Sequence, residues 1–119
     1  MLTIKLTKMH RGGPKSTTFS GRPEGKAVRK ALCLDSLENG VDKVVIKIPN
    51  DTTSFNPSFF LGLLFESVKK CGSIDAFKAK YSFDFSEFPE ELCTFIKVDL
   101  EDSYQRCENE LNKKTGIDL

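Results

Sequence analysis

The chain has 119 residues, of which 39% are hydrophobic and 29% charged, and its formal net charge is +1. This length suits one domain with one core, and the composition is too apolar for a disordered chain. No apolar run approaches the ~20 residues that a membrane-spanning helix needs. The start alternates apolar and polar residues, which is not the pattern of a signal peptide. We therefore expect one soluble domain over residues 1–119.

The cysteine pattern excludes the common metal and redox motifs. The four cysteines are Cys33, Cys71, Cys93 and Cys107. No pair has the spacing of a metal or disulfide-exchange motif, and the single histidine, His10, cannot complete a zinc set. We expect free thiols in a cytoplasmic protein, with no metal and no cofactor.

The residue pattern of the N-terminal third predicts a strand, a loop and a helix. Residues 2–7 alternate like a half-buried strand. Residues 9–18 are rich in Gly, Pro and polar residues and read as a flexible loop, with a short extended piece at 17–19. A helix then starts after Ser20 or Gly21, one of which caps it, and Pro23 lies in its first turn. Its expected end is the Asn39-Gly40 pair.

That helix is predicted to have two faces. The buried stripe is expected to hold the apolar residues Ala27, Val28, Ala31, Leu32 and Leu34. The basic side chains recur three or four residues apart, so we expect them together on the opposite face. They are Arg22, Lys26, Arg29 and Lys30.

The middle of the chain gives the strongest signals. Residues 42–49 form a nearly continuous β-branched run, which is typical of a central strand covered on both faces. A helix over 57–71 is well delimited, with Asn56 as N-cap, Pro57 at its first position and Gly72 directly after its last residue. It is apolar nearly all round and so must be buried on most sides. Within it, Gly62 indicates a close approach to the sheet.

The C-terminal third is less uniform. Residues 77–85 alternate like a strand, while Ser73 could instead cap a short helix to about Lys78, with the strand only after it. Residues 86–98 carry two signals, a helix start near Pro89 and a strand over 94–98. A last helix is expected from Asp99 to about Lys114.

Strands separated by helices predict an α/β fold, with a small mixed or parallel sheet and helices packed on it. The tightest unit is the strand at 42–49, the helix at 57–71 and the strand near 78–85. This is a βαβ crossover, which should be right-handed.

The charges are unevenly distributed along the chain. Between residues 8 and 30 there are seven basic residues and one acid, whereas residues 84–119 hold ten acids and four bases. An uneven surface is common in small proteins. The sharper interpretation is a site for an anionic ligand or partner. Its candidate residues are Arg11, Lys15, Arg22, Lys26 and Arg29.

Residues 17–65 resemble a STAS-like domain family of unknown function from bacteria and phages. Residues 20–29, Ser-Gly-Arg-Pro-Glu-Gly-Lys-Ala-Val-Arg, are similar to the family's Gly-Arg-Pro-x-Gly-x-x-x-Arg helix start. The strand at 44–48 and the Thr-Ser-Phe opening of an apolar helix at 53–65 are similar too. The strand ends in Ile48-Pro49-Asn50-Asp51, where the family has Asp-Phe-(small)-Gly. The resemblance implies a STAS-type sheet, no catalytic residues and a regulatory binding role.

The loop at 51–56 stands just ahead of the apolar helix. Backbone N–H groups at a helix N-terminus favour anions, so a phosphate added here would be stabilised. True STAS domains, which the family resembles, can be switched by phosphorylation in this loop. Thr53, Ser54 and Asn56 are therefore the candidate switch residues. Ordinary capping and turn chemistry favours the same residue types.

No set of residues demands catalysis. His10 lies in a loop without an adjacent cysteine, and the acidic pairs of the C-terminal part read as solvated helix faces. We expect a non-enzymatic regulatory or adaptor module that binds a protein partner. The alternative is a phosphate or nucleic-acid binding protein that uses the basic segment 8–30. A balanced net charge and an acidic C-terminal part oppose broad phosphate binding.

Overall fold

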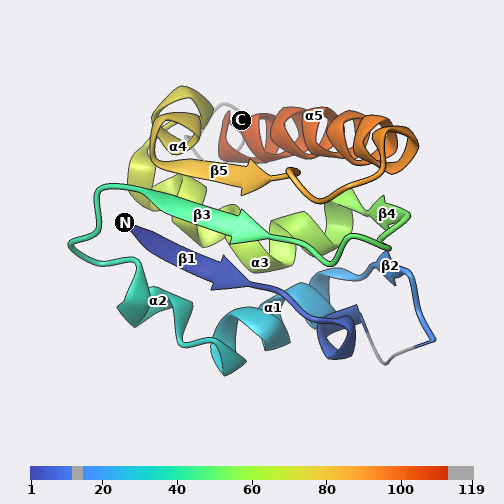
Figure 1. Ribbon diagram of the computed structural model, residues 1–119. Coiled ribbons are helices and arrows are strands. Elements are labelled where there is room, and N and C mark those ends of the chain that lie inside the picture. Colours follow the sequence, from blue (N-terminus) through green and yellow to red (C-terminus); the bar gives the residue numbers. More distant parts are fainter. Residues whose placement is uncertain (12–14, 113–119) are drawn as a thin grey trace.

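The order of helices and strands alternates along the chain, as Figure 1 shows. The structure is a computed structural model that describes residues 1–11 and 15–112. The strands are β1 (Leu2–Lys5), β2 (Thr18–Phe19), β3 (Val44–Lys47), β4 (Ser54–Phe55) and β5 (Tyr81–Asp84). The helices are the 3-10 turn η1 (Lys8–Arg11), α1 (Arg22–Ala31), α2 (Leu34–Leu37), α3 (Pro57–Cys71), α4 (Ile74–Lys80) and α5 (Glu90–Asn112).

The strands form two parallel sheets. The larger has the order β1-β3-β5, and the smaller pairs β2 with β4. The predicted α/β fold and the central place of β3 are confirmed, and of the mixed and parallel alternatives the parallel one is realised. The β3-α3-β5 crossover is right-handed, since in Figure 1 the strands point right, α3 lies behind them and β5 lies above β3.

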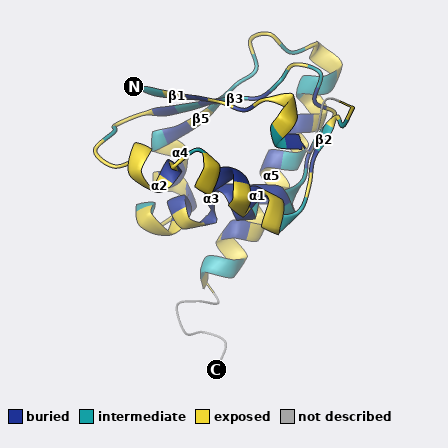
Figure 2. Cartoon of the chain, turned by 90° about the horizontal axis from the view of Figure 1, so that it is seen from below, coloured by how far each residue is buried: buried dark blue, intermediate teal, exposed yellow. Residues whose placement is uncertain are grey.

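The helices cover one face of the larger sheet (Figure 2). The register places Ile4, Ile46 and Phe83 side by side on the covered face. Lys5, Lys47 and Asp84 lie side by side on the other. The expectation that β3 is covered on both faces is therefore wrong. Successive right-handed crossovers that step in one direction put every helix on the same side of the sheet.

Helix α3 is the centre of the core. Its predicted bounds are confirmed: the Asn56 side chain accepts a hydrogen bond from the Ser58 N–H, Pro57 is the first residue, and Gly72 ends the helix with φ 94°. Eight of its fifteen residues are buried, and it packs against α1, α4 and α5. Phe59, Phe60 and Leu64 have no exposed surface.

Helices α1 and α3 touch through their backbones. A Cβ on Gly25 would lie 2.3 Å from the carbonyl oxygen of Phe59, and a Cβ on Gly62 would lie 2.1 Å from that of Arg22. The close approach predicted for Gly62 is present, but its partner is α1 and not the sheet.

This crossing also sets the orientation of α1. Gly25, Val28 and Arg29 are buried, whereas Ala27 and Ala31 are exposed. The predicted apolar stripe is therefore wrong for Ala27 and Ala31, and the predicted basic face is wrong for Arg29. The missing side chain of Gly25 lets α3 approach, which turns Arg29, one turn later, inward. The helix ends at Ala31, and Cys33, with φ 55°, separates it from α2.

After α3 the chain forms a short helix and then a strand, which is the second of the two structures that the sequence allowed. Ser73 caps α4 by accepting a hydrogen bond from the Ala76 N–H. The strand starts only at Tyr81, so residues 77–80 are helical. Phe77 and Tyr81 are both buried, and their rings stack with centroids 4.5 Å apart.

Helix α5 is continuous from Glu90 to Asn112. The strand predicted at 94–98 is wrong, and Asp99 lies inside the helix. Ile96, Leu100, Ser103 and Cys107 are buried at helical spacing, and packing of this face against α3 outweighs the β-propensity of the 94–98 segment. The helix end predicted near Lys114 lies outside the described residues, as do Gly12, Gly13 and Pro14 of the predicted loop. Of that loop, residues 9–11 belong to η1 and Thr18 to β2.

Candidate functional site

Arg11, the first predicted anion-binding residue, is buried beneath the loop at 51–56. Its side chain has no exposed surface. The guanidinium donates hydrogen bonds of 2.8 Å to Asp51 and 2.9 Å to the Thr52 hydroxyl. The hydrogen bond from Arg11 to Asp51 and the positive charges of Arg11 and Lys8 lower the pKa of Asp51 to about 2. Arg11 thus links the segment that follows β1 in the sequence to the loop that follows β3.

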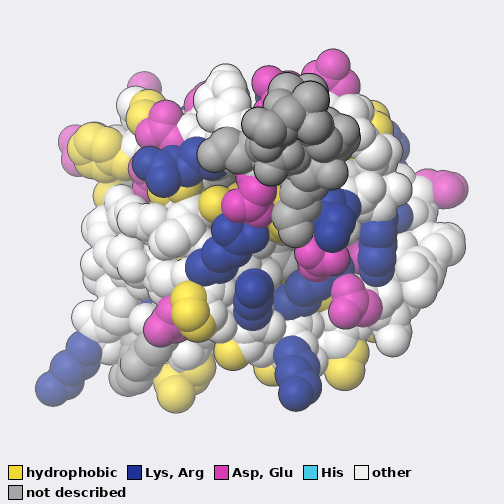
Figure 3. Space-filling view, turned by 180° about the vertical axis from the view of Figure 1, so that it is seen from behind, with side chains coloured by type: hydrophobic (Ala, Val, Ile, Leu, Met, Phe, Trp, Pro, Cys, Tyr) yellow, Lys and Arg dark blue, Asp and Glu magenta, His cyan; other side chains and the backbone are white. Residues whose placement is uncertain are grey.

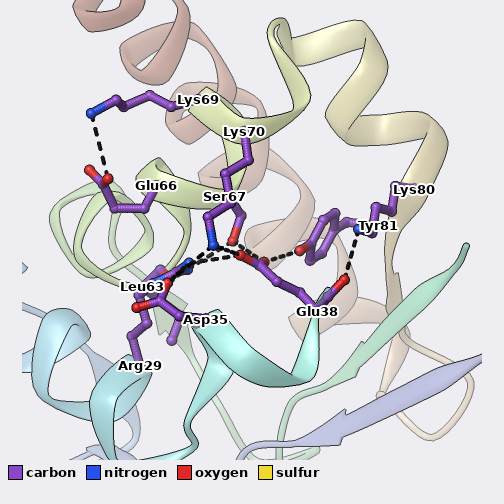
Figure 4. A network of polar contacts seen from close by, with 10 residues as sticks. All are labelled: Arg29, Asp35, Glu38, Leu63, Glu66, Ser67, Lys69, Lys70, Lys80 and Tyr81. Carbon is purple, nitrogen blue, oxygen red and sulfur yellow. Dashed lines mark hydrogen bonds and ion pairs between the residues drawn. The ribbon is translucent and has the colours of Figure 1, made fainter. Parts of the chain in front are cut away.

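Arg29 is the buried centre of a second set of charges (Figure 4). It donates to Asp35 at 2.5 Å, to Glu38 at 2.9 Å, and to the Leu63 carbonyl and the Ser67 hydroxyl, each at 2.8 Å. These contacts join α1, α2 and α3. The positive charge of Arg29 is therefore paired with one buried carboxylate, Glu38, and one exposed carboxylate, Asp35.

Glu38 is the buried carboxylate of the same network. It accepts hydrogen bonds from Ser67, Lys70 and Tyr81. Burial by itself raises the pKa of Glu38, but these hydrogen bonds and the charge of Arg29 outweigh it and hold the pKa below its usual range. Burial and the Glu38 hydrogen bond raise the pKa of Tyr81. The network therefore contains an ionised Glu38 and a neutral Tyr81 at neutral pH.

The five predicted basic residues do not converge on one site. Arg22 makes a bidentate ion pair with Glu110, with N–O distances of 2.9 and 2.6 Å. Lys15 and Lys26 are exposed and have no hydrogen bond or ion pair within residues 1–11 and 15–112. Seen from behind (Figure 3), Lys and Arg side chains lie interspersed with acidic ones rather than in one patch.

The loop at 51–56 is held by hydrogen bonds to three parts of the chain. Besides Arg11 beneath it, the Thr53 hydroxyl lies 2.8 Å from that of Thr17 and is exposed. The Ser54 hydroxyl donates to Asp99 of α5 at 3.1 Å, and the Phe55 N–H donates to the same carboxylate oxygen at 2.9 Å. Asn56 serves as the cap of α3. The three candidate switch residues are therefore adjacent but face different neighbours.

Helix α5 presents an exposed stripe that the sequence-based interpretation missed. Its members are spaced four, three and four residues apart, which places them on one helix face. This docking stripe consists of Glu91, Phe95, Val98 and Asp102. Phe95 and Val98 are 58% and 57% exposed. The signal was hidden because residues 94–98 resemble a strand, in which Phe95 and Val98 would fall on opposite faces.

Asp99 links the docking stripe to the loop at 51–56. It follows Val98 directly and lies one helical turn after Phe95. Its carboxylate accepts the two hydrogen bonds from Ser54 and Phe55. The sequence pattern places Asp99 at the start of the last helix, so no local signal points to this contact.

The described residues contain no group of three His, Cys, Asp or Glu side chains that could hold a metal ion. The four cysteines are unpaired, and burial raises the pKa of Cys107 to about 12, which makes it a poor nucleophile. No helix in the part of the chain that the structure describes is long and apolar enough to cross a membrane.

Comparisons with known proteins give no assignment. The chain matches no family model, and searches of curated proteins and of solved structures found no significant match. The STAS-like resemblance therefore stays a prediction, and the function is argued from the geometry.

Proposed function

We propose that the protein is a non-enzymatic regulatory module that binds a protein partner through the docking stripe of α5. The observation that carries this proposal is the exposure of Phe95 and Val98 on one helix face. Large apolar side chains that are adjacent and exposed mark interaction sites more often than isolated ones do.

The charge around the stripe defines the chemistry of the partner. Glu91 precedes Phe95 by four residues, and Asp102 follows Val98 by four, so an acid flanks the apolar pair at each end. Both acids are exposed. A complementary partner segment carries apolar side chains between Lys or Arg residues. An amphipathic basic helix has this pattern.

The loop at 51–56 is the proposed switch. A phosphate on Ser54 would add about two negative charges beside the Asp99 carboxylate, which the Ser54 hydroxyl now contacts at 3.1 Å. Repulsion between them would disturb α5 one turn from Phe95. This agrees with the switch role implied by the STAS-like resemblance. We further propose a cytoplasmic location, since all four cysteines are free thiols.

The experiment is a quantitative pull-down from native lysate at low salt. The bait is the wild type, a Phe95→Ala/Val98→Ala double variant, or the control Leu37→Ala, which removes an exposed apolar side chain 43% accessible on α2. We expect one stoichiometric partner that the double variant loses and the control keeps. Retention by the double variant would exclude the stripe. Turnover of a nucleotide or ester by the pure protein, abolished by one point change, would exclude a non-enzymatic role.

The alternative, phosphate or nucleic-acid binding by the basic segment 8–30, has less support. Arg11, Arg22 and Arg29 each already pair with a carboxylate. Lys15 and Lys26 remain exposed. Fluorescence anisotropy with DNA, RNA and ATP at ~50 mM salt tests this alternative, because each phosphate contact gives a steep salt dependence. If none of the three ligands binds at this salt concentration, the alternative function is excluded.

A further inference from the structure

A cavity of about 330 Å³ lies at the carboxyl ends of β1, β3 and β5. Its walls are residues 5–8, residues 47–50, and Asp84 together with residues 86–88. The segments that leave three neighbouring parallel strands thus enclose one space. Ligands of parallel α/β sheets bind at this edge, and the volume is within the range of small-molecule sites.

The open face of the sheet brings two lysines to the cavity. Lys5 and Lys47 are register partners on adjacent strands, and Lys47 is in turn the register partner of Asp84. The Lys47 Nζ lies 3.6 Å from Asp84. The Lys5 ammonium has no hydrogen bond or ion pair among the described residues. Like charges opposite each other on neighbouring strands are unfavourable unless an anion joins them.

The third lysine of the lining, Lys8, shares its acid with another cation. Lys8 lies 3.4 Å from Asp51, but the same carboxylate is already bound by Arg11 at 2.8 Å. The second acid that lines the cavity besides Asp84 is Glu87, which is exposed to solvent. Three lysines thus line the cavity against two acids, so one positive charge is left over, and Lys5 is the lysine without an ion pair among the described residues.

Apolar surface completes the lining. Pro49 and Phe88 are half-buried and belong to neighbouring segments of the lining, and the Phe88 ring is held edge-on against Phe85 with centroids 5.6 Å apart. A ligand here meets ammonium groups on the strand ends and a fixed ring on the β5 side.

We propose that this cavity binds a small phosphate monoester with a flat apolar body. The phosphate dianion is held between Lys5 and Lys47, within reach of Lys8, and the body packs against Phe88 and Pro49. Lysine ammonium groups bind phosphate as point charges. A dianion is attracted to these ammonium groups more strongly than a monoanionic carboxylate would be.

The test is an NMR titration of the ¹⁵N-labelled 119-residue chain with phenyl phosphate, inorganic phosphate and benzoate. We expect saturable shifts confined to residues 5–8, 47–50 and 84–88, with phenyl phosphate the tightest of the three. The ester binds better than inorganic phosphate because of its ring, and better than benzoate because of its second charge. If benzoate binds as tightly as phenyl phosphate, the preference for phosphate is wrong.

Two exposed lysines provide the matched variants. Lys5→Gln should weaken phenyl phosphate about tenfold, the loss of one charge-assisted contact. Lys26→Gln, on α1 and away from the cavity, should leave the affinity unchanged. The proposed site is wrong if the titration gives no saturable shift or gives shifts over the whole surface. It is also wrong if both variants lose the same affinity for phenyl phosphate. Lys5→Gln should also retain the partner in the pull-down, so failure of the ligand site and failure of the docking stripe are distinguishable.

Discussion

Gly25 of α1 and Gly62 of α3 face each other where the two helices cross, each against the backbone of the other helix. Neither position has room for a Cβ. Although alanine favours an isolated helix over glycine, Gly25→Ala or Gly62→Ala should lower the free energy of unfolding by about 1–3 kcal/mol, because the crossing must open. Gly62→Leu should cost more.

Thermal melts of these variants measure the effect, with Ala27→Ser on the exposed side of α1 as the control. The control should stay within about 0.5 kcal/mol of the wild type. If Gly62→Leu melts like the control, the close crossing of α1 and α3 is wrong.

The core of α3 should be far more sensitive than the docking stripe. Phe60→Ala and Leu64→Ala remove side chains without exposed surface and should each cost about 2–5 kcal/mol. Phe95→Ala removes the same ring from an exposed position and should cost less than about 0.5 kcal/mol. Denaturant unfolding compares them. Equal losses for Phe60→Ala and Phe95→Ala would mean that Phe95 is packed and that the stripe is not available to a partner.

The Glu38 network should make stability depend on acidity. The folded protein lowers the pKa of Glu38, so its contribution to stability is complete above the pKa of the unfolded chain, about 4.3. That contribution is lost as the pH falls through the lowered value. Glu38→Gln should therefore melt below the wild type at pH 7, and the gap should close below about pH 4.

The control for this pH series is Glu66→Gln, which breaks the exposed Lys69 pair on the same helix as Ser67 and Lys70. An exposed pair contributes about 0–1 kcal/mol, so the control should differ little from the wild type at any pH. A Glu38→Gln gap that does not change between pH 7 and pH 3 would contradict an ionised Glu38 in the network.

The contact between Ser54 and Asp99 predicts a charge-dependent coupling. Ser54→Asp places a second carboxylate against Asp99 and should destabilise the protein, whereas Ser54→Asp/Asp99→Asn should recover part of the loss. Thr53→Asp, at an exposed neighbour, should have little effect. Melting of the single and double variants gives the coupling free energy. A coupling of zero would separate the loop from α5 and remove the proposed switch.

Local patterns were sufficient for much of the fold. Asn56, Pro57 and Gly72 delimit α3 because caps act through neighbouring residues, and the β-branched run of β3 identifies the central strand. The errors arose where packing between distant segments decides. Arg29 is buried because Gly25 lets α3 approach, and residues 94–98 are helical because α5 packs on α3. The predicted basic site failed to assemble for the same reason: the carboxylates that pair with Arg11 and Arg22 come from distant parts of the chain.

Site-specific photo-crosslinking at the docking stripe tests the central claim most directly. Benzoylphenylalanine replaces Phe95 in one protein and the exposed Leu37 in another, and each is irradiated in native lysate. We predict one dominant adduct from position 95, absent from position 37, whose crosslinked peptide carries apolar residues between Lys or Arg. Introducing Ser54→Asp should reduce its yield. Identical adducts from both positions, or an adduct with an acidic peptide, would contradict partner binding through Phe95 and Val98.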